Sequence, residues 1–243
     1  MNNVRIPGVL AILAASVAII GCGKKEEPKA AAPAPAPAAA APAPAPKPEI
    51  VVKIGHVAPL TGPIAHLGKD NENGARLAVD DANAKKIEID GKVIKFELLG
   101  EDDQADPKTG TVVAQKLVDA KVAGVVGHLN SGTTIPASAI YNQSGLPQIS
   151  PSATNPKYTQ QGFNTAFRVM ANDIQQGSVI GTYAAKDMGA KKFAIIDDRT
   201  AYGQGLADEV EKAAKAAGAT VVAREFTNDK ATDFKAILTK IKA

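Results

Sequence analysis

The stretch VAGVVGHLNSGTTIPAS, residues 122–138, indicates the fold most clearly. Its apolar run at 122–126 predicts a short buried strand, and the helical pattern at 135–143 has Pro136 near its first turn. A turn rich in glycine and hydroxyl groups, including Ser131, lies between them. A helix start has free backbone N–H groups and a partial positive charge. This corner therefore predicts a site for a small anion such as a carboxylate.

A second hydroxyl-rich corner, SPSATNP at residues 150–156, follows a predicted strand at 146–149. Parallel strands end at a shared edge of a doubly wound sheet, and ligands bind in the crevice there. The two corners therefore predict one ligand site, to which the hydroxyl groups of Thr133, Ser152 and Thr154 also contribute. Taken alone, the first corner is more typical of an ordinary helix cap and the second of a turn.

Strand and helix patterns alternate along the rest of the chain. We first expect strands at residues 51–57, 93–99, 122–126, 146–149 and 167–170, with helices at 67–83, 109–121 and 135–143. The pattern then restarts, with helices at 173–187, 203–217 and 233–242 and strands at 192–197 and 220–226. This alternation predicts an α/β fold built from doubly wound parallel sheets.

The restart predicts two lobes joined by a hinge at 171–173. We expect an N-terminal lobe at residues 49–171 and a partial second lobe at 172–243. The second lobe has few strands, and its last helix has an apolar face without a following strand to cover it. We therefore expect a C-terminally truncated protein or a fragment, and a small complete lobe is the alternative.

The N-terminus reads as a secretory signal. Arg5 precedes the apolar stretch 6–20, which is too short for a comfortable membrane span. The residues before Cys22 resemble a bacterial lipobox, which predicts a signal peptide at 1–21 and a lipid on Cys22 that holds the protein to a membrane. A non-cleaved anchor and an ordinary signal cut elsewhere are the alternatives. Cys22 is the only cysteine, so no intramolecular disulfide is possible.

Residues 22–48 form a linker rich in alanine and proline. Proline disfavours helix at each repeat, so we interpret the linker as a semi-rigid polyproline-like spacer, about 60 Å long for roughly 20 residues. A ligand for a proline-binding module is the alternative reading.

Composition and motifs exclude several function classes. The chain has 28 basic and 25 acidic residues without a basic stripe, which argues against a nucleic-acid partner. The three histidines have no metal-binding spacing, and the acidic cluster at 102–106 lacks the glycine and glutamate of a calcium loop. We read that cluster as a solvated turn in which Asp106 caps the next helix. No nucleophile elbow, phosphate loop or complete dinucleotide motif is present, so we predict no metal, no cofactor and no enzyme activity.

From Val52 onward, the chain resembles periplasmic solute-binding proteins of the branched-chain amino acid type, which have the type I periplasmic-binding fold. The resemblance rests on the order and spacing of short motifs, which are KIG at 53–55, PLTGP at 59–63, GARLAV at 74–79, DD at 102–103, DP at 106–107, GH at 127–128, PAS at 136–138, SPSATNP at 150–156 and DRTAYG at 198–203. Leu67 departs from the family, because many members have an aromatic residue there near the ligand side chain.

The resemblance implies that two lobes close around an amino acid and that a membrane transporter receives the closed form. In the family, the ligand carboxylate meets the turn that corresponds to Leu129–Thr133, where Ser131 offers its hydroxyl and backbone N–H. The ammonium group meets the corner of Ser152, Ala153 and Thr154, through the Ser152 carbonyl and the Thr154 hydroxyl. Tyr202 corresponds to an aromatic residue that closes over the ligand.

The leading hypothesis is a lipid-anchored periplasmic receptor that delivers leucine, isoleucine, valine or a related amino acid to an ABC permease complex. The sequence leaves open which membrane holds the lipid. A sensing receptor of the same fold for amides or other small carboxylates, without transport, is the alternative. A doubly wound hydrolase or nucleotide-dependent enzyme is the third hypothesis, and it is disfavoured by the absence of the motifs named above.

Overall fold

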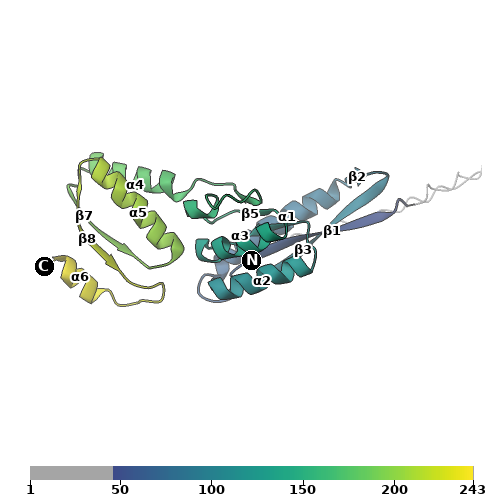
Figure 1. The fold of residues 1–243 in the computed structure, drawn as a ribbon, viewed down its shortest axis with the longest axis horizontal. Coiled ribbons are helices and arrows are strands. Elements are labelled where there is room, and N and C mark those ends of the chain that lie inside the picture. The colour runs from purple at the N-terminus through teal and green to yellow at the C-terminus, as the bar shows by residue number, and fades with distance from the viewer. Residues whose placement is uncertain (1–45, 243) are drawn as a thin grey trace, which may run out of the picture. The chain divides into compact units, whose positions relative to one another are not determined.

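The computed structural model describes residues 46–242 (Figure 1). The predicted signal peptide at 1–21, Cys22 and most of the predicted linker therefore lie outside the described residues. Within the described part, no helix has both the length and the apolar character needed to cross a membrane.

The larger sheet has the strand order β2-β3-β1-β4-β5-β6. Its strands are β1 (Glu49–Ala58), β2 (Glu88–Ile89), β3 (Lys92–Asp102), β4 (Gly124–Gly127), β5 (Gln148–Ser150) and β6 (Ala166–Arg168). The connecting helices are α1 (Ala65–Ala84), α2 (Pro107–Asp119), α3 (Ser131–Gln143) and the short 3-10 helix η1 (Pro156–Tyr158). The chain passes from β1 outward to β3 and then returns to place β4 on the other side of β1. The carboxyl ends of β1 and β4 thus form a switch point, where such folds bind ligands.

One strand departs from the predicted parallel arrangement. β2 pairs antiparallel with β3, whereas the other pairs in this sheet are parallel. The turn at Asp90-Gly91 joins the two strands, and both of its residues have positive φ. A strand of two residues has no periodicity, so the sequence pattern did not reveal β2.

The two faces of the large sheet are covered by different helices. Successive strand residues point to opposite faces. Val57 belongs to the main apolar core, which is formed with α2 and α3 through side chains such as Leu117 and Tyr141. The adjacent His56 is also fully buried, on the other face, where the charge of Glu72 of α1 raises its pKa against the lowering by burial. α1 therefore covers one face of the sheet, and α2 and α3 cover the other.

A second sheet follows the predicted boundary between residues 171 and 172. It contains the parallel strands β7 (Lys192–Asp197) and β8 (Thr220–Phe226), with the helices α4 (Asp173–Lys186), α5 (Ala201–Ala216) and α6 (Lys235–Lys242). The division into two lobes remains a prediction, because the described residues, 46–242, belong to a single compact unit.

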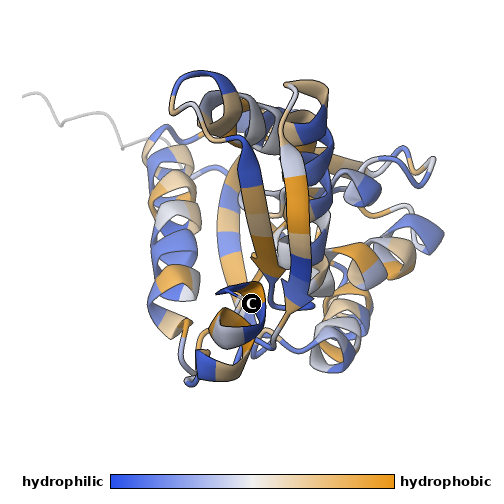
Figure 2. Cartoon of the chain, turned by 90° about the vertical axis from the view of Figure 1, so that its left-hand side faces the viewer, coloured by the Kyte–Doolittle hydropathy of each residue, from blue (hydrophilic) through white to orange (hydrophobic). Residues whose placement is uncertain are grey.

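Glycines bring α4 and α5 together, and the two helices run side by side in Figure 1. A Cβ at Gly177 would lie 2.6 Å from Glu209 Cβ, and one at Gly181 would lie 2.6 Å from the carbonyl oxygen of Val210. Figure 2 shows apolar bands along β7 and β8, where Val222 and Phe226 are exposed. The described part of the second sheet therefore buries fewer apolar side chains than the first.

Candidate functional site

The first corner lies at the start of α3. This helix begins at Ser131 rather than at the predicted Ile135, so Pro136 lies inside it instead of in its first turn. The carbonyl oxygen of Asn130 accepts the first hydrogen bonds, from the backbone N–H of Thr133 at 3.1 Å and of Thr134 at 2.9 Å. The N–H groups of Ser131 and Gly132 precede these bonds, so the helix offers them no acceptor. Both remain available to an anion at the positive end of the helix.

A buried polar network fixes this corner. His128 Nδ1 lies 2.9 Å from Asp103 Oδ2, and His128 Nε2 lies 3.1 Å from the hydroxyl oxygen of Tyr141. All three side chains are fully buried. Gly127 precedes the network with φ +137°, and a Cβ there would lie 2.3 Å from the carbonyl oxygen of Val57 in β1. β4 therefore ends in direct contact with β1. The bonds of His128 to Asp103 and Tyr141 hold the start of the turn that follows β4.

The solvated-turn reading of the acidic cluster was wrong for Asp103, which is buried against His128. Asp102 also has structural partners, since it accepts hydrogen bonds from the N–H of Leu60 and the hydroxyl of Thr61. The prediction for Asp106 is confirmed, because its side chain caps α2 by accepting from the N–H of Thr109 at 2.7 Å. Acidic residues that follow a strand look alike in sequence, so the sequence could not show that Asp103 is buried while its acidic neighbours are more exposed.

The second corner follows β5 and is hydrogen-bonded to the first. Ser150 Oγ donates to the carbonyl oxygen of His128 at 2.7 Å and accepts from the N–H of Ala153 at 2.9 Å. The N–H of Asn155 donates to Ser131 Oγ at 3.3 Å. The two hydroxyl-rich corners therefore lie against each other at the switch point of the sheet.

The predicted ligand residues of the first corner differ in accessibility. Ser131 is buried, and Leu129 is half-buried. Thr133 is fully buried and faces α2, where a Cβ at Gly110 would lie 3.1 Å from Thr133 Cβ. The hydroxyl of Thr133 donates to the carbonyl oxygen of Asn130. The side chain of Thr133 is thus occupied within the protein, which leaves Ser131 as the polar group of this corner that faces the second one.

The second corner presents oxygen atoms. Ser152 Oγ donates to Asn71 Oδ1 of α1 at 2.9 Å, and Ala153 is buried. Thr154 is half-buried, and its hydroxyl is a buried atom with no hydrogen-bond partner among the described residues. A buried hydroxyl without a partner is costly and is therefore rare in folded proteins. Thr154 thus has the capacity to bind a donor from a ligand.

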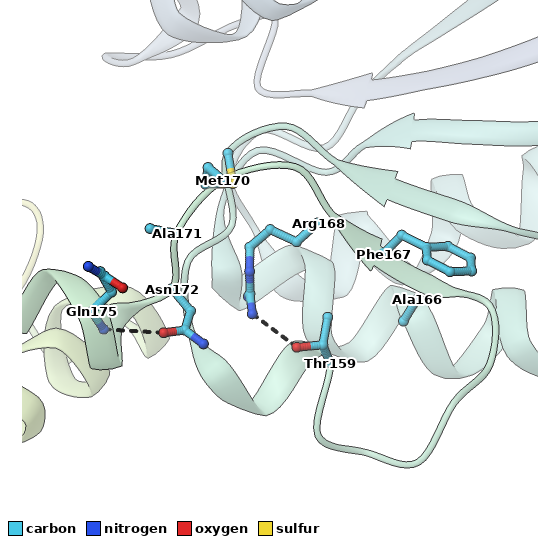
Figure 3. Close-up of a pocket in the computed structure, with 8 residues that line it drawn as sticks. All are labelled: Thr159, Ala166, Phe167, Arg168, Met170, Ala171, Asn172 and Gln175. Carbon is cyan, nitrogen blue, oxygen red and sulfur yellow. Dashed lines mark hydrogen bonds between the residues drawn. The ribbon is translucent and has the colours of Figure 1, made fainter.

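Arg168 of β6 holds the second corner in place. Its Nη1 donates to the carbonyl oxygens of Ala153 at 3.2 Å and Asn155 at 3.0 Å. Its Nη2 donates to Thr159 Oγ1 at 2.9 Å, and Figure 3 draws this last bond. Burial lowers the pKa of Arg168 from its ordinary value, and the charge of Asp173 partly offsets this.

An open hollow of about 450 Å³ lies beside Arg168. It is lined by Thr159, Ala166, Phe167, Arg168, Met170, Ala171, Asn172 and Gln175. None of the predicted ligand residues lines this hollow, so it is separate from the meeting point of the two corners.

The second sheet contributes α5. Thr200 caps this helix by accepting from the N–H of Gly203 at 2.9 Å, and Tyr202 in the first turn is 40% exposed. Asn155 Nδ2 donates to the carbonyl oxygen of Ala201 at 2.6 Å. This bond connects the second corner directly to the turn that carries Tyr202.

Sequence reasoning missed three residues that organise this site. Ser150 joins the corners, Arg168 clamps one of them, and Asn155 reaches α5. Asn155 lies in a motif that is typical of a turn, so the sequence did not indicate that its side chain donates to the carbonyl oxygen of Ala201 at the start of α5. Ser150 was the most predictable of the three, because a hydroxyl directly after a strand lies at the edge where ligands bind.

Comparison with known proteins agrees with this architecture. The model of a family described as periplasmic binding proteins matches residues 51–243. The chain belongs to this family. It is 42% identical over 194 residues to the Leu/Ile/Val-binding protein homolog 1 of Brucella abortus, which covers 80% of this chain and 51% of the relative. The chain therefore spans about half the length of the curated relatives it matches.

Solved structures of the family have the same fold. The branched-chain amino acid transporter substrate binding protein LivJ from Streptococcus pneumoniae, in complex with isoleucine, has a TM-score of 0.70 and 35% identity, covering 80% of this chain and 54% of its own. A solute binding protein of an ABC transporter from Rhodopseudomonas palustris, in complex with 3,4-dihydroxybenzoic acid, has a TM-score of 0.68 and 26% identity, covering 79% and 51%. The fold is thus that of type I periplasmic binding proteins, as predicted.

Proposed function

We propose that the protein is a solute receptor that binds a branched-chain or related amino acid between its two lobes and delivers it to an ABC importer. The observation that carries this proposal is the contact between the two corners, in which the N–H of Asn155 in the second corner donates to Ser131 Oγ at the start of α3. The second corner also holds the hydroxyl of Thr154, which has no partner among the described residues. A zwitterion needs donors for its carboxylate and acceptors for its ammonium group only a few ångströms apart. The two corners offer this pair.

In this proposal each corner binds one charge of the ligand. The backbone N–H and hydroxyl of Ser131 donate to the carboxylate, where the partial positive charge of α3 adds to the attraction. Leu129 lines the same turn. The carbonyl oxygen of Ser152 and Thr154 Oγ1 accept from the ammonium group, with Ala153 between them. Tyr202 closes over the ligand from α5. The side chain of Thr133 supports the turn and makes no ligand contact.

A second candidate function has support from one comparison. The structural relative from Rhodopseudomonas palustris was solved with 3,4-dihydroxybenzoic acid, which has a carboxylate and no ammonium group. A receptor for small carboxylates or amides, which senses its ligand without transport, would use the α3 corner alone. Neither candidate involves turnover of the ligand, so we expect no enzyme activity.

A thermal-shift screen of the protein encoded by the full-length gene separates these candidates. The ligands are the common amino acids, their amides and small aromatic acids. At 100 times its Kd, a ligand stabilises the folded state by about 2.7 kcal/mol, which corresponds to roughly 5–10 °C for a chain of this size. We expect such a shift with leucine, isoleucine or valine. A shift with aromatic acids alone would favour the second candidate, and no shift with any amino acid would refute the first.

The cellular location is part of the proposal. We propose that Cys22 carries lipid chains, which hold the protein at a membrane surface on the periplasmic side, because the apolar stretch before it has the length and position of a lipoprotein signal. Replacing Cys22 with serine should release the protein from the membrane fraction after signal cleavage. Retention of the variant in that fraction would point to a non-cleaved anchor.

A further inference from the structure

Tyr141 of α3 has a hydroxyl group inside the main apolar core. Its side chain is fully buried, and it packs there with residues such as Leu117. The hydroxyl oxygen lies 3.1 Å from His128 Nε2. A buried hydroxyl is costly unless it is hydrogen-bonded, and phenylalanine would fill almost the same space without that cost. The bond to His128 is therefore the contribution that tyrosine makes here and phenylalanine would not.

This bond belongs to a chain of hydrogen bonds with a defined direction. The carboxylate of Asp103 accepts hydrogen bonds, so a ring proton of His128 lies on Nδ1, which donates to Asp103 Oδ2 at 2.9 Å. In the neutral ring, Nε2 is then an acceptor for the hydroxyl of Tyr141. Burial raises the pKa of Tyr141 above its ordinary value, and the charge of Asp103 raises it further, so the hydroxyl keeps its proton.

His128 also binds the start of α3 and the second corner through its backbone. Its carbonyl oxygen accepts from Thr134 Oγ1 at 3.2 Å and from Ser150 Oγ at 2.7 Å. Two side chains of α3, those of Thr134 and Tyr141, therefore bond to this one residue. They are seven residues apart, which is about 10 Å along the helix axis. Two bonds at this separation restrain the tilt of α3 as well as its position.

The two bonds lie on either side of a weak point in α3. Pro136 lies inside the helix between Thr134 and Tyr141, and proline has no N–H to donate to the preceding turn. The first turn of α3 is therefore tied less firmly to the rest of the helix than in an unbroken one. Because His128 binds α3 before and after Pro136, it keeps the two parts in one line.

The other side-chain bonds of α3 connect it to a different part of the chain. Three of its side chains bond to the segment at residues 155–165, and these are Ser131, Ser138 and Asn142. These bonds would let α3 shift together with that segment. Among the side-chain hydrogen bonds of the described residues, those of Thr134 and Tyr141 hold α3 to the end of β4.

We propose that Tyr141 is a positioning residue for the ligand carboxylate, because through His128 it fixes where the start of α3 stands at the strand ends. This inference rests on the proposed function. Tyr141 lies ten residues from Ser131, about 15 Å along the helix, so it acts on the ligand only through the placement of α3. Hydrogen bonds weaken steeply when their angle departs from linearity, so a small tilt of the first turn reduces binding of a carboxylate at Ser131.

The test is a double-mutant cycle of Tyr141→Phe and Ser131→Ala in the full-length protein, with calorimetric titration of leucine. Tyr141→Phe keeps the ring and removes the hydroxyl. Alone, it should weaken leucine binding by about 10-fold, which is within the range of coupling inside one hydrogen-bond network. In the Ser131→Ala background it should weaken binding by less than about 3-fold, because the hydroxyl contact that it positions is already absent.

The matched control is Tyr158→Phe. Tyr158 is also fully buried, and its hydroxyl donates to the carbonyl oxygen of Gln148 at 3.0 Å. Any loss of affinity in this variant should have the same factor with and without Ser131→Ala. Should circular dichroism show that Tyr141→Phe is unfolded, Thr134→Val takes its place in the cycle, because it removes the other bond of α3 to His128, and the same two factors are expected.

The outcomes separate positioning from stability. A loss of equal factor in both backgrounds would overturn the inference, because a role in folding alone does not depend on Ser131. A loss below about 2-fold for Tyr141→Phe alone would overturn it as well. Wild-type protein that binds no amino acid would refute the proposed function, and this inference with it.

Discussion

At the scale of single residues, two serine side chains of the proposed site are held in place by hydrogen bonds between the corners. Ser131 is buried, and its hydroxyl accepts the N–H of Asn155, which leaves its own proton free to donate. Ser150 Oγ donates to the carbonyl oxygen of His128 and also accepts from the N–H of Ala153 in the turn after β5. A ligand of the proposed site would therefore meet groups whose positions are already set, which reduces the entropy lost on binding.

Ser131→Ala should weaken binding of leucine by about 10-fold to 150-fold, because a hydrogen bond to a charged group contributes about 1.5–3 kcal/mol. Isothermal titration calorimetry measures the change. Ser138→Ala is the matched control, since Ser138 is buried on the same helix and donates to the carbonyl oxygen of Ile135. Equal effects of the two substitutions would mean that Ser131 acts through helix stability and not through ligand contact.

His56 makes the stability of the protein depend on pH. It is fully buried, and burial lowers the pKa of its imidazole, while Glu72 opposes the shift. His128 adds to the lowering, and Asp103 opposes it. Because the unfolded state then takes up the proton more readily, stability should be complete above the unfolded pKa of about 6.5 and should fall as the pH falls below it.

The free energy of unfolding should fall by no more than about 2 kcal/mol at pH 5. That pH lies about 1.5 units below the unfolded pKa, and each unit corresponds to about 1.4 kcal/mol. Urea unfolding at pH 7.5 and pH 5 measures it. His56→Gln should flatten the difference between the two pH values, whereas His66→Gln, at an exposed position, should leave it intact. A pH profile unchanged by His56→Gln would contradict the assignment.

At the scale of elements, the site depends on how closely helices approach the strand ends. The predicted helix at 67–83 is confirmed as α1, which spans Ala65–Ala84. Its first turns lie against the end of β1, where a Cβ at Gly68 would lie 2.0 Å from the carbonyl oxygen of Pro59. The same helix contributes Asn71, which binds Ser152 in the second corner. A shift of α1 would therefore displace the corner that we propose binds the ammonium group.

Gly68→Ala should destabilise the protein by about 1–3 kcal/mol, because the added methyl group overlaps backbone atoms that cannot rotate away. Gly74→Ala is the control in the same helix, since no described atom outside its own turn lies within 4 Å of the added Cβ. That substitution should stabilise α1 by about 0.8–1 kcal/mol. Chemical denaturation measures both, and effects of the same sign would contradict the close approach at Gly68.

The bond between Asn155 and Ala201 joins the second corner to α5. Asn155→Asp keeps the acceptor that binds the N–H of Lys157 but replaces the donor with an oxygen that repels the carbonyl of Ala201. We expect leucine binding to weaken roughly 10-fold or more, since a hydrogen bond contributes about 1 kcal/mol and repulsion adds to its loss.

Asn142→Asp makes the same chemical change in α3, where Asn142 Oδ1 accepts from Thr165 and would continue to do so. Its effect on affinity should stay below about 2-fold, as for most changes away from a buried feature. A loss of affinity in Asn142→Asp as large as in Asn155→Asp would indicate a general charge effect.

At the scale of the whole molecule, the sequence predicted the order of elements well, because apolar periodicity and turn residues are local signals. The helix at 109–121 is confirmed as α2, and the strand at 192–197 is confirmed as β7. The start of α3 was placed too late, since Pro136 was taken as a first-turn residue although the helix tolerates it further along.

The site was predictable only in part. Its two corners follow from hydroxyl-rich turns after successive strands, which sequence shows directly. The long-range contacts were not predictable, because Asp173 of α4 and Gly205 of α5 meet the second corner only once the chain has folded. A buried aspartate at a helix start is indistinguishable in sequence from an ordinary exposed one.

The central claim is that the two corners bind the opposite charges of one amino acid. A crystal structure of the full-length protein with leucine tests it most directly. The account predicts the carboxylate within about 2.7–3.2 Å of Ser131 N and Oγ, and the ammonium nitrogen at the same range from the carbonyl oxygen of Ser152 and from Thr154 Oγ1. Leucine bound in the reverse orientation, or at a site that touches neither corner, would contradict it.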